Sequence, residues 1–363
     1  IIPSLGDGGA ESFFLRLIPY FKNENIIITL FNTKSDKRRL QNIKAKYISL
    51  DPRRTSFKYF YLFIKLIFSL DKGDIIFSWL YIADLFASIL KILLFWKKFS
   101  IVWNVRNSIL EKNQYSFLSY FSYKILKNYF KEIPYKIIFN SKESMESHIS
   151  QGYIREKSIL IHNGFKRNVP IRNTKNSKNS FNIIYVARFH NQKNHNLLFR
   201  SLNKLYLDHN IEFKLHLVGK DLDEKNYKLV KDLDNFNILE KVQLHGLIHP
   251  LAVHELFSKC DITLLLSKYG ESFPNVIAEA MLYGTFPIAT KIGETDLIVD
   301  KFGDIVPINV SPEKISNLIY KYYLQKKKDF SLWKKKIKEC QEFSNKRFKI
   351  ETAAKKFEMI SRY

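Results

Sequence analysis

The fold of this chain is decided by a stretch that reads GESFPNVIAEAM at residues 270–281. The apolar run before it, residues 261–267, predicts a buried strand. Pro274 suits the first turn of a helix, because its missing N–H would have no partner at that position. The stretch therefore predicts a strand, a short loop and a helix in succession.

Two carboxylates flank the predicted start of this helix. Glu271 lies in the loop, and Glu279 lies more than one turn into the helix. The N–H groups at a helix start form a site for phosphate, and carboxylates accept hydrogen bonds from sugar hydroxyls. A phosphate site with a carboxylate on each side suits a sugar nucleotide.

Length and composition indicate two domains and a reducing environment. The chain has 363 residues, of which 46% are hydrophobic, enough for two cores. Cys260 and Cys340 form no C-x-x-C pair, so we expect no disulfide framework and a cytoplasmic protein. No uncharged run reaches 18 residues, and no signal peptide is evident, so no transmembrane helix is predicted.

The net charge of +24 is concentrated in the first half. Residues 1–180 hold 30 Lys and Arg against 13 Asp and Glu. Such an excess favours an anionic partner, either nucleic acid or an anionic membrane surface. A genome rich in A and T, which favours Lys, Asn, Ile and Phe codons, also accounts for this composition.

Strand and helix patterns alternate along the whole chain, which predicts parallel sheets covered on both faces. Residues 1–4 indicate the end of a strand. In the first half, strands are predicted at 26–31, 74–79, 98–104, 135–140 and 158–162, and helices at 12–21, 81–96 and 142–151. In the second half, strands are predicted at 182–187, 214–219, 242–245, 261–267 and 286–290, and helices at 194–206, 225–234 and 249–258.

The polar residues 169–180 lack apolar periodicity and are predicted to be a linker. The predicted fold class is α/β, with two facing Rossmann-like domains and a cleft between them. The first domain comprises residues 1–168, with a C-terminal helix at about 346–363 packing back on it. The second domain comprises residues 181–345. A ligand is expected at the carboxyl ends of the strands.

With these residues laid out, the chain resembles the retaining glycosyltransferases of family 4, which have the GT-B architecture. The resemblance spans nearly the whole chain and is strongest over residues 182–296. It rests on four signals in the order of that family: GGAE at residues 8–11, Arg188 with Lys193, His245-Gly246, and Glu271 with Glu279.

The resemblance implies roles for the charged residues. Glu279 would bind the ribose hydroxyls of the donor, and Glu271 would contact the donor hexose. Arg188 and Lys193 would neutralise the leaving diphosphate, so no metal ion or other cofactor is expected. Each also has an ordinary interpretation, as a solvated helix position, a loop Glu or surface charge of a Lys-rich chain.

Backbone groups complete the implied donor site. Gly8 and Gly9 would let the first domain approach the donor, and Gly219 would lie close to the nucleotide. The segment Ser272-Phe273-Pro274-Asn275 would offer N–H groups to sugar or phosphate oxygens, except at Pro274, which has none.

Arg106 departs from the family pattern, which has a His at this place. An Arg cannot act as a general base, but it could hold a phosphate or an acceptor diphosphate. Because retaining members are thought to use a donor phosphate oxygen for deprotonation, loss of the His need not abolish activity. We therefore count Arg106 among the candidate catalytic residues.

Segments that mix aromatic residues with lysines recur in the first half, at residues 56–68, 93–98 and 115–130. Aromatic side chains suit the depth of lipid headgroups, and lysines suit anionic lipid. The same pattern fits core helices whose lysines extend to solvent. The lysines at 326–328 suit a solvated helix face equally well.

The sequence thus predicts a retaining glycosyltransferase that uses a UDP- or GDP-linked sugar. Its acceptor would be a polyprenyl-diphosphate-linked or polysaccharide glycan of the bacterial surface, of O-antigen or capsule type. It would be cytoplasmic and peripheral on the inner face of the cell membrane. Two alternatives remain open: a basic nucleic-acid-binding protein, although no zinc spacing or recognition motif supports it, and a GT-B phosphorylase or epimerase.

Overall fold

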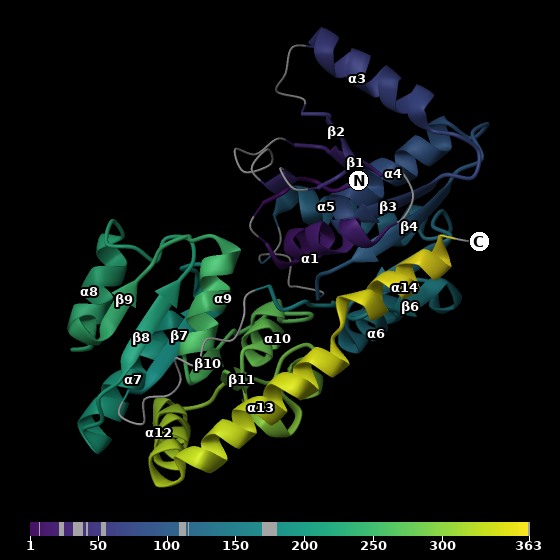
Figure 1. Ribbon diagram of the computed structural model, residues 1–363. Coiled ribbons are helices and arrows are strands. Elements are labelled where there is room, and N and C mark those ends of the chain that lie inside the picture. Colours follow the sequence, from purple (N-terminus) through teal and green to yellow (C-terminus); the bar gives the residue numbers. More distant parts are fainter. Residues whose placement is uncertain are drawn as a thin grey trace. The chain divides into compact units, whose positions relative to one another are not determined.

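The computed structural model describes residues 1–6, 8–21, 25–31, 39–40, 43–51, 56–108, 114, 116–168 and 180–361, with only the backbone of 56–60. The chain divides into two compact units (Figure 1). The first contains Ile1–Gly164 and Lys349–Tyr363, and the second contains Phe165–Phe348. Of the linker predicted at residues 169–180, all but Ser180 lies outside the described residues.

The first unit is built on parallel strands. Ile2 N donates to Ile28 O at 2.9 Å, and Trp79 N donates to Ile1 O at 2.9 Å, so the first two residues bond to strands of both sheets. One sheet pairs β1 (Ile26–Thr29) with β2 (Lys46–Ser49). The other runs in the order β3 (Ile75–Trp79), β4 (Ser100–Val105), β5 (Lys136–Phe139) and β6 (Ser158–Leu160).

Both faces of this second sheet are covered, because neighbouring residues of a strand point to opposite sides. Ile101 and Ile137 pack in one core, whereas Val102 and Ile138 pack in another. The first core contains residues of α3 (Ser56–Ser69), α4 (Leu80–Leu93) and α5 (Phe117–Ile125). The second contains residues of α1 (Gly9–Leu17) and α14 (Ile350–Ile360). Further helices in the described part of this unit are η1 (Ile18–Tyr20), η3 (Leu126–Phe130), α6 (Lys142–Ser150) and η4 (Arg155–Lys157).

The second unit has one parallel sheet, whose strand order reverses at its centre. The order is β12 (Asp304–Val306), β11 (Phe286–Thr290), β10 (Ile262–Leu265), β7 (Asn182–Val186), β8 (Lys214–Val218) and β9 (Val242–Leu244). The chain leaves β7 toward β8 and returns to pair β10 with β7 on its other side. This switch point is where open α/β sheets bind ligands, beyond the carboxyl ends of the strands.

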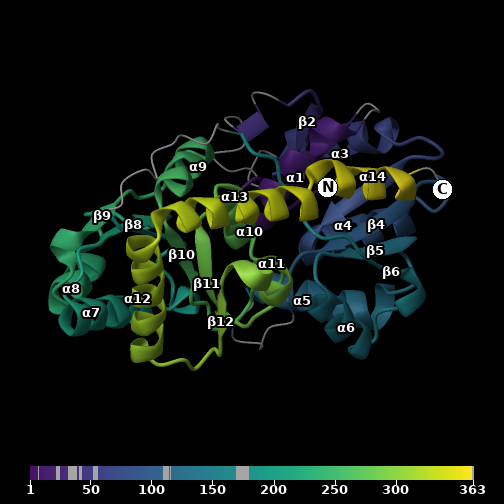
Figure 2. The same ribbon diagram turned by 60° about the horizontal axis from the view of Figure 1, so that its bottom comes forward.

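The crossovers between parallel strands are right-handed, so helices that connect strands in one direction across the sheet lie on one face. Helices that connect strands in the other direction lie on the opposite face. The helices after β7 and β8 are α7 (His195–His209) and α8 (Tyr227–Asn235), and α12 (Pro312–Lys328) packs against α7 (Figure 2). The helices that cross the other way are α9 (Pro250–Lys259), α10 (Asn275–Leu282) and α11 (Thr295–Val299). The shorter helices are η6 (Asn191–Lys193), η7 (Leu239–Lys241) and η8 (Asp300–Phe302), and α13 (Phe330–Arg347) packs against α10.

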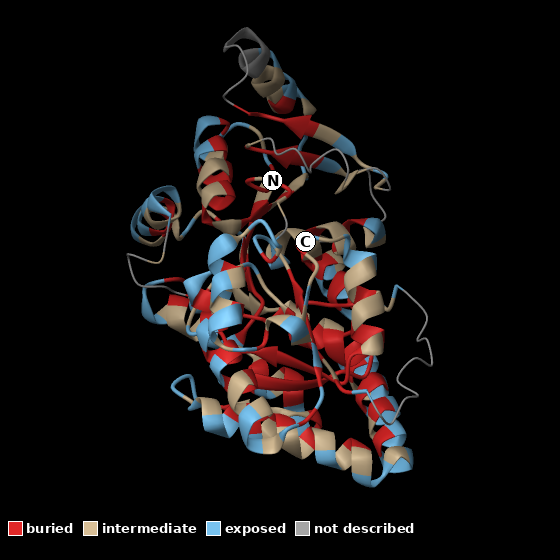
Figure 3. Ribbon diagram, turned by 90° about the vertical axis from the view of Figure 1, so that its left-hand side faces the viewer, coloured by how far each residue is buried: buried red, intermediate tan, exposed pale blue. Residues whose placement is uncertain are grey.

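Figure 3 shows that the strands of this sheet are mostly buried. All four residues of β10 and all five of β11 are buried, as expected for a sheet covered on both faces. The parallel α/β arrangement predicted from the alternating patterns is therefore confirmed. Some boundaries differ: α10 starts at Asn275, one residue after Pro274, and α1 starts at Gly9 rather than at residue 12.

A buried ion pair fastens α12 to the start of the central strands. Lys326 Nζ lies 2.8 Å from Asp261 Oδ1, and both side chains are buried. The same ammonium group donates to Ser180 O at 2.7 Å, and Asn182 N donates to Asp261 Oδ2 at 2.9 Å. The interpretation of lysines 326–328 as one solvated face is wrong for Lys326, because an apolar core surrounds the start of β10.

We expect Lys326→Met to lower the free energy of unfolding by about 3–5 kcal/mol, because it leaves the buried Asp261 carboxylate without its counter-charge. Lys328→Met, an exposed position two residues along the same helix, should change it by less than about 0.5 kcal/mol. Urea denaturation followed by circular dichroism compares the two variants. Similar losses at both positions would contradict the ion pair's contribution.

Candidate functional site

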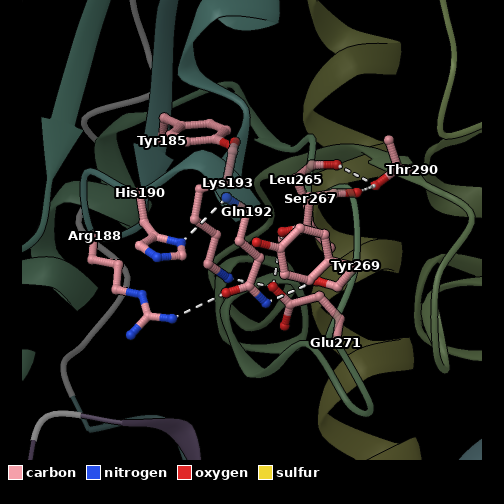
Figure 4. A network of polar contacts seen from close by, with 10 residues as sticks. All are labelled: Tyr185, Arg188, His190, Gln192, Lys193, Leu265, Ser267, Tyr269, Glu271 and Thr290. Carbon is pink, nitrogen blue, oxygen red and sulfur yellow. Dashed lines mark hydrogen bonds and ion pairs between the residues drawn. The ribbon is translucent and has the colours of Figure 1, made fainter. Parts of the chain in front are cut away.

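The segments that follow β7 and β10 meet at the carboxyl edge of the second unit's sheet. Arg188 and Lys193 come after β7, and Glu271 comes after β10. Because β7 and β10 are parallel neighbours, these side chains lie in one network (Figure 4). The sequence analysis named all three residues as candidates, and the structure brings them together.

The Glu271 carboxylate is held from two sides. Lys193 Nζ forms an ion pair with Glu271 Oε1, and Ser267 Oγ donates to the same oxygen at 2.8 Å. The two charged side chains are 18% and 14% exposed, so their interaction is screened less than that of a surface pair. The pair fixes a cation and an anion next to each other at this edge.

Gln192 joins the two segments and was not identified from the sequence. Arg188 donates from its NH2 nitrogen to Gln192 Oε1 at 3.1 Å, and Gln192 Nε2 donates to Tyr269 O at 2.8 Å. Lys268 N also donates to Gln192 O at 2.8 Å. Because both ends of the Gln192 amide are bonded, this side chain fixes the position of Arg188 relative to the loop after β10. Its only sequence signal was its place between Arg188 and Lys193.

The backbone of η6 is fixed by residues on both sides of it. The Tyr185 hydroxyl donates to Lys193 O, and Gln192 N donates to His190 Nδ1 at 3.2 Å. Burial, with the charges of Arg188 and Lys193, lowers the pKa of His190 from its ordinary value. The imidazole is therefore neutral at pH 7, which leaves Nδ1 able to accept this hydrogen bond.

Gly219 permits a close approach between two of the loops at this edge. It follows β8 with φ of +144°, and a Cβ there would lie 1.9 Å from Ala187 O. Gly219 N donates to Gly246 O at 2.8 Å. The chain that leads into Arg188 thus rests against the chain after β8. This packing requires glycine whether or not the residue also meets a ligand.

His245 follows the edge strand β9 and pairs with His216 of the neighbouring strand β8. His216 Nδ1 and His245 Nε2 lie 3.0 Å apart, and the two rings stack. Burial, followed by the influence of His245, lowers the pKa of His216 to about 4. The structure therefore gives His245 a packing partner.

The start of α10 is packed against the rest of its unit. Ser272 and Phe273 are buried, and the Phe273 ring lies 6.2 Å from that of Phe165 and 5.6 Å from that of Phe348, between centroids. The side chain of Phe273 therefore serves the core, and only its backbone suits a ligand. Glu294 N donates to Ser272 O at 3.0 Å, a contact that the sequence did not indicate.

The first backbone amides of α10 come before the first hydrogen bond within the helix. Ile277 N donates to Pro274 O at 3.1 Å, so the amides of Asn275 and Val276 come before the first turn closes. Glu279 lies four residues after Asn275, on the same side of the helix. It is partly exposed, whereas Ala278 and Ala280 beside it are buried. The sequence analysis placed a phosphate site and its second carboxylate here, and that role stays a prediction.

Gly8 and Gly9 form the start of α1 in the first unit. Gly8 is the residue before the helix, in extended conformation, and Gly9 is its first residue. A Cβ on Gly8 would lie 2.3 Å from the Glu11 carboxylate. Arg39 also fastens this loop, donating to Leu5 O at 3.3 Å and Ser12 Oγ at 3.1 Å. Asp7, the residue before Gly8, lies outside the described residues.

Arg106 lies inside the first unit and is only 6% exposed. Its guanidinium donates to Asn163 Oδ1 at 3.0 Å and Asn104 Oδ1 at 3.1 Å. The same group lies over the Trp79 ring, 4.6 Å from the centroid. Burial lowers the pKa of Arg106 to about 9, and the Asp84 carboxylate opposes this shift. These contacts account for its position as a structural residue, so a role in the reaction stays a prediction.

No group of three or more His, Cys, Asp or Glu residues in the described ranges is placed to hold a metal ion. No helix in the described part of the chain is long and apolar enough to cross a membrane.

One family model matches most of the second unit. Residues 168–339 match the family model described as Glycosyl transferases group 1. No curated protein matches the sequence. The sequence analysis expected this kind of domain from Arg188, Lys193, Glu271 and Glu279, all of which lie within the matched residues.

Several solved structures share the fold over the whole chain. Anabaena HepE (Alr3699), solved with UDP and with UDP-glucose, is 20% identical with a TM-score of 0.80, over 100% of this chain and 98% of HepE. A Rickettsia africae glycosyltransferase is 18% identical with a TM-score of 0.75, over 99% and 96% of the two chains. Sucrose-phosphate synthase from Thermosynechococcus elongatus is 18% identical with a TM-score of 0.72, over 99% and 94%. These likenesses confirm the predicted GT-B fold, with two Rossmann-like domains on parallel sheets.

We expect Gly219→Ala to lower the free energy of unfolding by about 3 kcal/mol or more, through a strained φ and a clash with Ala187 O. Gly152→Ala is the matched control: its φ is +103°, and nothing lies within 4 Å of the added Cβ. It should cost only about 1–2 kcal/mol, from backbone strain. Equal losses in thermal unfolding would refute the close approach between the two loops.

Proposed function

We propose that the chain, whose residues 168–339 match the glycosyl transferases group 1 model, is a glycosyltransferase that transfers a sugar from a nucleoside-diphosphate sugar with retention at the anomeric carbon. The retaining mechanism and membership of family 4 come from the resemblance of the sequence. The observation that carries the proposal is the network of Arg188, Lys193 and Glu271 at the switch point of the sheet.

The donor diphosphate is the group that this edge suits best. Arg188 can bind phosphate oxygens through two nitrogens, and Lys193 supplies a second positive charge. The amino end of α10 adds backbone N–H groups and a favourable dipole. Charge on the leaving nucleoside diphosphate rises as the glycosidic bond breaks, so these groups would stabilise the transition state. We propose that the two cations replace a metal ion in this role.

The ion pair links diphosphate binding to sugar binding. Before the donor binds, Glu271 balances the charge of Lys193. We propose that the donor enters beside this pair, so that Lys193 contacts both the diphosphate and the carboxylate. Glu271 would then face the hexose, where positive charge develops in the transition state. Gln192 would keep Arg188 in place while Lys193 gains the diphosphate as a second partner.

Glu279 is proposed to bind the donor ribose. Its carboxylate lies on α10 beyond the phosphate-binding end, and a carboxylate can accept hydrogen bonds from two vicinal hydroxyls. UDP is the first nucleotide to test, because HepE was solved with UDP and UDP-glucose. A GDP-linked donor is the alternative.

The acceptor is proposed to be a lipid-linked or polysaccharide glycan of the bacterial surface, of O-antigen or capsule type. Support comes from the basic, aromatic first half of the chain, which suits an anionic lipid surface. The protein would then act on the inner face of the cell membrane. Sucrose-phosphate synthase shares the fold, so the fold does not by itself define the acceptor.

We expect UDP to stabilise the protein in EDTA, whereas ADP should not. A ligand at 100 times its Kd adds about 2.7 kcal/mol to stability. Arg188→Met should weaken UDP binding at least tenfold, about 1.4 kcal/mol, because it removes a cation from the diphosphate site. Arg200→Met, on the exposed side of α7, is the control and should bind UDP normally. Thermal unfolding with titrated nucleotide measures each affinity, and unchanged UDP affinity in Arg188→Met would reject the assignment.

We expect Glu271→Gln and Glu279→Gln to lower kcat/KM for transfer by at least 100-fold, about 2.7 kcal/mol in the transition state. Glu279→Gln should also weaken UDP, whereas Glu271→Gln should act mainly on the sugar step. Glu212→Gln, at a largely exposed Glu, is the control. Products formed with and without acceptor separate a transferase from a phosphorylase or epimerase. Full activity in Glu279→Gln would overturn its proposed contact with ribose.

A further inference from the structure

Large aromatic side chains are exposed on three successive connections of the first unit. Phe68 precedes β3, Phe95 and Trp96 precede β4, and Tyr129 precedes β5. Their exposed fractions are 78%, 79%, 61% and 77%. Exposed aromatic residues are ordinary when single, but a group of them marks an interaction site.

Topology brings these connections together. The strands β3, β4 and β5 are parallel neighbours, so their amino-terminal ends share one edge of the sheet. Lys97 Nζ donates to Ile67 O at 2.6 Å, which fastens the turn after α4 to the end of α3. Gly73 N donates to Lys98 O at 3.0 Å, and Tyr135 N donates to Ile101 O at 2.8 Å. We call this region the amino edge; it comprises residues 61–74, 91–99 and 124–136.

The apolar surface continues onto the last turns of α4. Ile89, Ile92 and Leu93 are exposed, although the core-facing side of that helix is also apolar. A helix at the surface of a protein in water normally carries polar residues on its outer side. The end of α4 therefore has an unpartnered apolar face that leads into Phe95 and Trp96.

The segments that carry this apolar surface are rich in lysine. The three segments of the amino edge contain nine lysines and three carboxylates. Glu132 is paired with Lys157 at 3.3 Å, and Asp74 accepts a hydrogen bond from Asp71 N at 2.8 Å. The surface thus combines exposed aromatic rings with a clear excess of positive charge.

We propose that the amino edge docks on an anionic lipid bilayer. Aromatic rings and short apolar stretches enter the headgroup region, and lysines beside them meet lipid phosphates. A second copy of the chain fits less well, because a symmetric contact would bring the same lysines of both copies together. The choice of an anionic membrane as partner rests on the proposed function, and the amino edge specifies the surface that would contact it. Lipid binding itself does not require the proposed reaction.

Docking by the amino edge would orient the first unit. Arg106 follows β4 and lies at the opposite, carboxyl edge of the sheet. The length of a five-residue strand separates the two edges, about 17 Å at 3.3 Å per residue. The carboxyl edge would therefore stay in water while the amino edge contacts lipid.

Trp96 provides a built-in probe of this contact. Of the four tryptophans in the chain, Trp79, Trp103 and Trp333 are buried, and Trp96 alone is exposed. The full chain is mixed with vesicles of phosphatidylcholine alone or with one quarter phosphatidylglycerol. We expect co-sedimentation only with the anionic vesicles, a blue shift of Trp96 emission, and quenching by brominated lipid.

Two sets of variants test the surface while keeping the probe. Phe68→Ser with Phe95→Ser removes aromatic contacts, and Lys72→Gln with Lys98→Gln removes positive charge. Each pair should lower the vesicle partition coefficient at least tenfold. The control pair, Leu207→Ser with Tyr227→Ser, changes exposed apolar residues of the second unit and should bind like the parent. UDP-induced stabilisation should persist in all of them, which separates failure of lipid binding from failure of the donor site.

Three outcomes would overturn the proposal. The first is a parent protein that does not bind anionic vesicles. The second is binding that leaves Trp96 emission unchanged, or that both variant pairs retain, because another face would then contact the lipid. The third is a parent dimer in sedimentation equilibrium that Phe68→Ser with Phe95→Ser dissociates, since the amino edge would then bind a second copy.

Discussion

The parallel pairing of β10 with β7 is the constraint on which the second unit depends. These strands are far apart in sequence, yet Ile262 pairs with Ile183 and Thr263 with Ile184. At the amino end, Asp261 accepts a hydrogen bond from Asn182 N and pairs with Lys326. At the carboxyl end, Gln192 and the Lys193–Glu271 pair connect the loops that follow. The same strand pairing therefore closes the core and creates the candidate site.

The charged groups of the site are held by polar partners before any ligand arrives. A carboxylate with a lysine and a serine donor, and an arginine with an amide acceptor, lose little freedom when a ligand binds. Such preorganisation is what electrostatic stabilisation of a leaving diphosphate requires. In the first unit, Arg106 differs in being buried, and two of its nitrogens donate to Asn104 and Asn163 inside the protein. A buried cation of this kind contributes mainly to the packing of its own unit.

Local patterns predicted much of this architecture. Alternating apolar strands and amphipathic helices gave the parallel sheets, and the run from Asp261 to Glu279 gave the strand, loop and helix of the site. The role of Gln192 was not predictable, because a single Gln between two basic residues carries no local signal. Lys326 was also missed, since it lies among three consecutive lysines and only its distance to Asp261 distinguishes it. The domain limits and the roles of the site residues stay predictions.

The sequence by itself determined the fold class and the candidate residues Arg188, Lys193, Glu271 and Glu279, because periodicity and motif order are local properties of the chain. Only the tertiary structure decided which of them meet. The strand order places β7 beside β10, and pairings such as Lys193 with Glu271 depend on a register set by packing across the sheet. Tertiary packing also decides that Phe68, Phe95 and Trp96 are exposed whereas other aromatic residues lie in the core. Composition counts them alike, and the fold alone decides which rings are covered.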